Sequence, residues 1–247
     1  MEVLQPEWDF YFCNVEGKLA SIMLDLSLHG IAPLSQRNCL IQVAVDLIDP
    51  DERGLTIPSE AEKLFVMEDM LAEQLAQTLQ GLYVARSTSD GKRIFYFYAA
   101  AMVGFQGIVD EVLGSFSEYS YGSQAFSDPD WAMYTQFLYP TTHEFHSILN
   151  RRALDQLRAQ GMGTDQVHTL HHHFEVENET HRLAILRKAK EKNFRAIKRP
   201  SDPSSMLVLK RDDQLSTEEL EKVTAYLLNL AEKHDGVYKG WQAAMMA

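Results

Sequence analysis

The sequence predicts an α+β protein of two domains, each a ferredoxin-like βαββαβ sandwich with an antiparallel sheet and helices on one face. Three observations predict it. Residues 164–246 contain a full βαββαβ series with marked boundaries. A second βαββαβ series begins at about residue 38, after two leading strands. The charge also changes sharply: residues 1–140 hold 20 Asp+Glu and 7 Lys+Arg, whereas residues 141–247 hold 15 and 16. We therefore expect domains at 1–140 and 141–247.

In the front half, residues 8–14 and 19–28 predict the two leading strands, joined at Glu16-Gly17. Apolar residues 38–48 predict a central strand. A helix should open at Pro58-Ser59, with Ser59 and Glu62 in capping-box spacing. The remaining expected elements are a hairpin of strands 82–88 and 93–99 about Asp90-Gly91 in a type I′ turn, a helix over 102–116, a strand near 119–126 and a short docking helix in 128–140.

The back half should begin with a helix over 145–158, capped by Thr141 and Glu144 and ending at Gly161. Strand 166–176, helix 180–193, strands 194–199 and 206–210, a second helix and strand 237–243 then follow. Pro200 to Pro203 must be a turn. The second helix is the best-marked element, with Ser216 and Glu219 as a capping box and Gly236 as the positive-φ stop.

Composition points to a cytoplasmic globular protein. The chain has 45% hydrophobic and 23% charged residues, no apolar run long enough for a membrane span, and a start unlike a signal peptide. Its two cysteines, Cys13 and Cys39, lie in apolar runs and are interpreted as core thiols. The acidic front half should repel nucleic acid.

Two motifs of the back half resemble the regulator of ribonuclease E activity B, a bacterial protein inhibitor of that RNA-degrading enzyme. One is Thr169-x-x-His172-His173; the other joins residues 229–233 to Tyr238-x-Gly240-Trp241. The resemblance covers about residues 148–243. The front half, with Trp131-x-x-Tyr134 and Asp90-Gly91, is similar to a bacterial family known only as a domain of unknown function. The resemblance implies a regulator that binds an RNA-degrading enzyme or its assembly by occupancy, without turnover or cofactor.

Candidate partner-binding residues follow from exposure and charge. The run Arg182–Arg199 holds eight Lys+Arg and one Glu, which is typical either of a solvated helix face or of an acidic-partner or RNA surface. Tyr238 and Trp241 are expected on opposite faces of the last strand, and Gly240 should permit close packing. Trp241 is expected to fill the core between sheet and helices, with a place at a partner surface as the alternative. One row of the hairpin aromatics, either Phe95 and Phe97 or Tyr96 and Tyr98, could form a protein-contact patch. The candidate contact residues are Arg187, Lys188, Lys192, Arg195, Tyr238 and Trp241.

The histidines of the strand His168–His173 suggest an alternative, a metal-dependent hydrolase. His171 and His173 point to the same side of a strand, and His143, His146 or His181 could add a third ligand. Neither a Cys pair nor a His-Glu-x-x-His motif accompanies them, which favours structural roles. His172 shares the side of Leu170 and should be a core histidine bonded to backbone or a hydroxyl. Direct RNA binding through Arg182–Arg199 is the third hypothesis, and oligomeric state is open.

Overall fold

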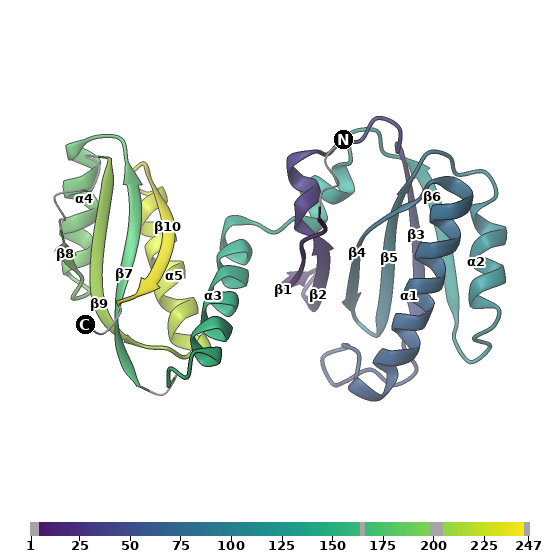
Figure 1. Cartoon of the computed structure of the whole chain (residues 1–247), viewed down its shortest axis with the longest axis horizontal. Helices are drawn as coiled ribbons and strands as arrows, with labels where there is room; N and C mark the ends of the chain where they lie inside the picture. The colour runs from purple at the N-terminus through teal and green to yellow at the C-terminus, as the bar shows by residue number, and fades with distance from the viewer. Residues whose placement is uncertain (1–4, 164–165, 198–204, 245–247) are drawn as a thin grey trace. The chain divides into compact units, whose positions relative to one another are not determined.

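The computed structural model describes residues 5–163, 166–197 and 205–244. It divides into two compact units, Met1–Thr141 (unit 1) and Thr142–Ala247 (unit 2). Each unit is α+β and is built on its own antiparallel sheet, as the sequence predicts (Figure 1). In the described residues, no helix combines the length and the apolar character that crossing a membrane demands.

Unit 1 is a ferredoxin-like sandwich extended by a hairpin. Its sheet has the order β1-β2-β4-β5-β3-β6, so the strands from β3 onward have the split βαβ arrangement and the β1–β2 hairpin continues the sheet beyond β4. The strands are β1(Trp8–Val15), β2(Lys18–Asp25), β3(Cys39–Asp46), β4(Leu82–Ser89), β5(Lys92–Ala99) and β6(Tyr121–Ser127). The helices are η1(Leu26–Gly30), α1(Pro58–Leu79), α2(Phe105–Leu113) and η2(Met133–Leu138).

One face of this sheet packs on α1 and α2. Alternate residues of β3 and β5 meet the stripe Leu64, Met67, Leu71 and Leu75 of α1, and all four side chains of the stripe are fully buried. Burying each such side chain stabilises the fold by roughly 1.5–3 kcal/mol. The predicted type I′ turn is confirmed, because Asp90 and Gly91 have φ of 49° and 74°.

The other face of the same sheet is covered by the segment around η2. Tyr98 stacks on Trp131 with ring centroids 3.9 Å apart, and its hydroxyl donates to Asp128. The docking helix expected in 128–140 is therefore present. The expectation that one aromatic row of the hairpin lies exposed is wrong, because both faces are covered. The four side chains concerned, Phe95, Tyr96, Phe97 and Tyr98, are at most 2% exposed.

Two local predictions in unit 1 need correction. The capping box at Ser59 and Glu62 is wrong, since α1 begins after Ile57 with Pro58 in its first turn and no side-chain cap. Glu60 instead turns inward and accepts the Ile48 amide at 2.8 Å. The second strand ends at Asp25, three residues before the predicted end, because the Asp25 side chain accepts from Ser27 N and starts η1.

Unit 2 has the ferredoxin-like order β10-β7-β9-β8, as predicted. Pro200 to Pro203, the expected turn, lie outside the described residues. The helices α4 and α5 pack on one face through Phe174, Ile185, Leu209 and Leu227, while α3 packs on α5 and β10. The elements are α3(Thr142–Ala159), β7(Val167–Val176), α4(Glu179–Lys190), β8(Arg195–Ile197), β9(Met206–Gln214), α5(Thr217–Glu232) and β10(Gly236–Ala243).

The ends of α5 show one confirmed prediction and one error. Ser216 is the N-cap, and its hydroxyl accepts from Glu219 N at 3.2 Å. At the other end, Asp235 rather than Gly236 takes the left-handed conformation, with φ of 49°. Gly236 already belongs to β10. A Cβ there would lie 2.9 Å from Ile185 Cδ1, so this glycine serves close packing.

Candidate functional site

The His-rich strand β7 presents different histidines to the two faces of its sheet. His172 faces the helices and is fully buried. Its Nδ1 is hydrogen-bonded to the Tyr238 hydroxyl at 2.9 Å, and its ring meets Phe194 edge-on at 5.4 Å. The structure thus confirms a core histidine bonded to a hydroxyl. His172 Nε2 lies 3.9 Å from Asp213 Oδ2, too far for a hydrogen bond.

Charged groups near His172 are paired through Asp213. Arg211 donates to both carboxylate oxygens of Asp213 at 2.8 and 3.0 Å, and its guanidinium lies 4.2 Å from the Phe194 ring centroid. Burial lowers the pKa of His172, and the Asp213 carboxylate opposes that shift. Burial acts to raise the pKa of Asp213, but His172 and Arg211 outweigh it and lower that pKa. The half-buried pair of Arg211 and Asp213 therefore borders the core of unit 2 beside the buried His172.

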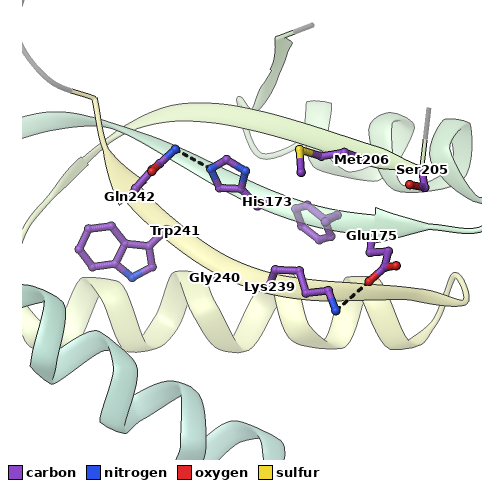
Figure 2. A pocket seen from close by; sticks show the side chains of 9 residues that line it. His173, Glu175, Ser205, Met206, Lys239, Gly240, Trp241 and Gln242 are labelled. Atoms are coloured by element: carbon purple, nitrogen blue, oxygen red, sulfur yellow. Dashed lines mark hydrogen bonds and ion pairs between the residues drawn. The ribbon is translucent and has the colours of Figure 1, made fainter. Parts of the chain in front are cut away.

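The opposite side of the sheet, here called the open face, carries His171, His173, Glu175, Met206, Lys210, Lys239 and Gln242. These residues alternate with the core residues of β7, β9 and β10, and the described helices of unit 2 pack on the other side (Figure 1). A hollow of about 530 Å³ lies on this face, lined mainly by β7 and β10. Figure 2 shows His173, Gln242, Lys239, Glu175 and Met206 around it.

The polar groups of this hollow are paired with one another. Gln242 Nε2 lies 2.9 Å from His173 Nε2, so the amide donates and the imidazole accepts (Figure 2). Lys239 Nζ lies 2.7 Å from Glu175 Oε2, and both side chains are more than half exposed. An ion pair of this exposure contributes only about 0–1 kcal/mol, so a partner can replace it at small cost. The arrangement offers hydrogen-bond donors, acceptors and the apolar side chain of Met206, which suits the docking of another molecule.

A second, smaller hollow of about 270 Å³ lies between β7, β8 and β9. Arg195 stands opposite Lys210 across the β8–β9 pair, and Arg211 and Asp212 also line the hollow. Among the described residues of the predicted basic run, Arg195 lies on this side of the sheet. The remaining predicted basic residues, Arg187, Lys188 and Lys192, lie on α4 or just after it. Lys188 pairs with Glu191 at 3.0 Å.

The six predicted contact residues therefore do not form one surface. Tyr238 is only 3% exposed and is hydrogen-bonded to His172, so it belongs to the core. Trp241 stands opposite His172 and donates its Nε1 hydrogen to Asn150 Oδ1 at 2.7 Å, so it also faces the helices. The prediction that Tyr238 and Trp241 occupy opposite faces is wrong, because a β-bulge between Tyr238 and Gly240 inserts one residue.

Three of the family-motif residues, Thr169, His172 and Gly240, have structural roles in this arrangement. Gly240 follows the bulge with φ of 111°, a conformation that favours glycine, whereas a Cβ there would meet nothing within 4 Å. The prediction that Gly240 permits close packing is therefore wrong. Glycine is needed at this position for its backbone conformation. Thr169 donates its hydroxyl hydrogen to Asp212 across the β7–β9 pair, and His173 belongs to the open face.

The metal hypothesis receives no support from the described residues. Across 5–163, 166–197 and 205–244, no three His, Cys, Asp or Glu side chains are grouped so that they could hold an ion. His171 and His173 lie on the open face, whereas His146 stacks on Tyr238 and His181 belongs to α4, both on the helix side of the sheet. His168 bonds to the Gly163 carbonyl at 2.9 Å. Of the two free cysteines, Cys39 is buried and Cys13 is half-buried.

Sequence reasoning missed Glu175, Met206, Lys239 and Gln242. The alternation of β7 places Glu175 beside His173, so this neighbour was available from the strand pattern. The positions of Lys239 and Gln242 could not be predicted from the strand pattern, because the bulge determines which face of the sheet their side chains occupy. Their contribution becomes visible only when the register of β10 against β7 is known.

The fold defines an α+β protein of two units, each with its own antiparallel sheet. Residues 6–139 match the family model described as "Family of unknown function (DUF695)". This match spans more than half of the chain, so the chain belongs to that family. Residues 147–243 match the family model "Regulator of ribonuclease activity B", and both resemblances read from the sequence are thereby confirmed.

No curated protein matches the chain. A crystal structure of an unknown protein from Galdieria sulphuraria is similar at 8% identity and a TM-score of 0.22, covering 85% of this chain and 99% of that one.

Proposed function

We propose that this protein regulates a ribonuclease by binding it through unit 2, and that it acts by occupancy without turnover. The observation that carries the proposal is the match to "Regulator of ribonuclease activity B" over residues 147–243. That range holds the whole βαββαβ series from β7 to β10 and most of α3. The partner is proposed to be an RNA-degrading enzyme of the ribonuclease E type or its assembly, in the cytoplasm.

The geometry of unit 2 supports a binding role. The buried His172 and Tyr238 are hydrogen-bonded to each other in the core, whereas the open face presents exchangeable pairs such as Lys239 with Glu175. Stable protein complexes bury on the order of 1,200–2,000 Å² in total, so a contact would extend from the hollow over β7, β9 and β10. The open face is the part of unit 2 we assign to the ribonuclease.

The test measures the initial rate at which purified ribonuclease E cleaves a fluorogenic RNA while the full chain is titrated in. We expect the rate to fall saturably. The triple variant His173→Ala, Lys239→Ala, Gln242→Ala should need at least about tenfold more protein for the same effect, equivalent to about 1.4 kcal/mol of binding. A matched triple at exposed positions of α5 and its C-cap, Glu218→Ala, Lys222→Ala, Lys233→Ala, should behave as the parent chain does.

Direct binding to the RNA is the competing explanation. It is favoured by the position of Arg195, which stands opposite Lys210 across the β8–β9 strand pair and near Arg211. It is separated by titrating the labelled RNA alone. Charge-driven RNA binding would fall steeply as salt rises. Inhibition that tracks RNA affinity, or a cleavage rate unaffected at saturating protein, would show that the proposed contact with the enzyme is wrong.

A further inference from the structure

One face of the β1–β2 hairpin in unit 1 carries exposed aromatic side chains. Trp8, Phe10 and Phe12 alternate along β1 and so share a face, and Met23 of β2 stands directly opposite Phe10. Phe10 is 37% and Phe12 52% exposed. Helix α1 packs over β4 and β5 and α2 over β6, so the hairpin extends the sheet beyond the helices (Figure 1). We call these four residues the hairpin face.

The hairpin face continues onto α1 through one cross-strand row. Phe65 of α1 is 43% exposed, and the Arg86 guanidinium lies 5.0 Å from its ring centroid. Arg86 stands opposite Met23, and Met23 stands opposite Phe10. The row Phe65–Arg86–Met23–Phe10 therefore runs from the helix to the edge strand as a single surface. Isolated exposed apolar residues are ordinary, but a contiguous set with aromatics marks a contact site.

The α1 border of this surface is acidic. Glu62, Asp69 and Glu73 are exposed and are spaced three and four residues along the helix from Phe65 and from one another, so they lie along the same side. Other charges of α1 are already paired: Lys63 with Glu118 at 2.6 Å and Glu68 with Arg86 at 2.6 Å. Within the described residues, no cation forms an ion pair with those three carboxylates.

We infer that the hairpin face and the acidic side of α1 together dock a basic segment of a partner protein, rich in Lys or Arg and aliphatic side chains. The aliphatic groups would cover Phe10, Phe12 and Met23, and the cations would meet Glu62, Asp69, Glu73 and the ring faces. Arg86 over Phe65 already shows one such cation–ring contact.

Charge decides against the other occupants. A second copy docked through the same face would bring the acidic borders of the two copies together, since an isologous contact uses one patch twice. Nucleic acid carries the wrong sign for residues 1–140, which hold 20 Asp+Glu against 7 Lys+Arg. This inference concerns unit 1 and does not depend on the ribonuclease proposal.

The test uses the full chain and two fluorescein-labelled peptides of alternating sequence, one of Lys and Leu and one of Glu and Leu, followed by fluorescence anisotropy. We expect the Lys-Leu peptide alone to bind, more weakly as salt rises. Phe10→Ser with Phe12→Ser should weaken it at least about tenfold. The matched control is Phe126→Ser, which removes a phenylalanine of similar exposure, 38%, on the opposite edge strand β6. It should leave binding unchanged.

A second arm keeps the inference testable if the aromatic variant unfolds. Asp69→Lys with Glu73→Lys should weaken the Lys-Leu peptide at least about tenfold as well, whereas Glu111→Lys on α2 should have little effect. Equal binding of the two peptides, or unchanged binding by both double variants, would overturn the inference. So would a dimer of the parent chain, seen by sedimentation, that Phe10→Ser with Phe12→Ser dissociates.

Discussion

The hydrogen bond between His172 and Tyr238 is buried in the core of unit 2 and can be removed by a single substitution. Tyr238→Phe removes the hydroxyl and leaves His172 Nδ1 buried without that partner. We expect a loss of about 1–3 kcal/mol in the free energy of unfolding, measured by urea denaturation. Tyr226→Phe is the matched control, because its hydroxyl donates to the Lys188 carbonyl at 3.1 Å in a half-buried position where water can substitute. A loss equal to the control's would contradict the assignment.

The same histidine gives unit 2 a pH dependence. Burial lowers the pKa of both His172 and His146 below the usual value of 6.5. As pH falls below 6.5, the unfolded chain therefore binds more protons than the folded chain, and stability decreases. We expect the free energy of unfolding to fall between pH 7 and pH 5. His172→Gln, which cannot titrate, should show a shallower slope over that window. An unchanged slope would mean that His172 is not the titrating group.

At this scale the sequence was informative about His172 and misleading about Tyr238. The alternation of β7 alone places His172 beside Leu170 and Phe174, and a buried imidazole needs a polar partner. Tyr238 and Trp241 are three residues apart, so strict alternation separates them. A bulge cancels that separation, and a bulge depends on how β10 pairs with β7 rather than on β10 itself.

At the scale of elements, a serine-to-alanine substitution is expected to have different effects at the N-termini of α1 and α5. Ser216 caps α5 with its side chain, so Ser216→Ala should cost about 1 kcal/mol of stability. Ser59 lies inside the first turn of α1 with no capping bond, so Ser59→Ala should change stability by less than about 0.5 kcal/mol. Thermal unfolding of both variants tests the pair. Equal losses would contradict the observed start of α1 after Ile57.

The strands and helices of both units were predictable because their apolar periods are strong. The stripe of α1 and the alternation of β5 are local patterns that survive in the structure. The sequence did not show in the same way that the segment around η2 covers the face of the unit 1 sheet opposite α1 and α2. Tyr96 and Tyr98 resemble an exposed row until Trp131, more than thirty residues later in sequence, stacks on Tyr98.

At the scale of the whole molecule, one architecture is used twice with different treatment of the face opposite the helices. In unit 1 that face is covered by η2 and its neighbours, with Trp131 and Tyr134 fully buried. In unit 2 it carries the hollow beside His173. In unit 1 the exposed aromatic residues Phe10 and Phe12 lie on the hairpin that extends beyond the helices, whereas in unit 2 the open face carries His173 and the ion pair of Lys239 with Glu175.

This division predicts that the two proposed activities separate when the chain is cut. Each unit has its own core, so fragments 1–141 and 142–247 should each unfold cooperatively in calorimetry. Fragment 142–247 should retain ribonuclease inhibition within about threefold of the full chain, since a change below about 0.7 kcal/mol leaves the contact essentially intact. Fragment 1–141 should bind the Lys-Leu peptide and leave cleavage unaffected. Inhibition that requires both fragments would mean that unit 1 contributes to the ribonuclease contact.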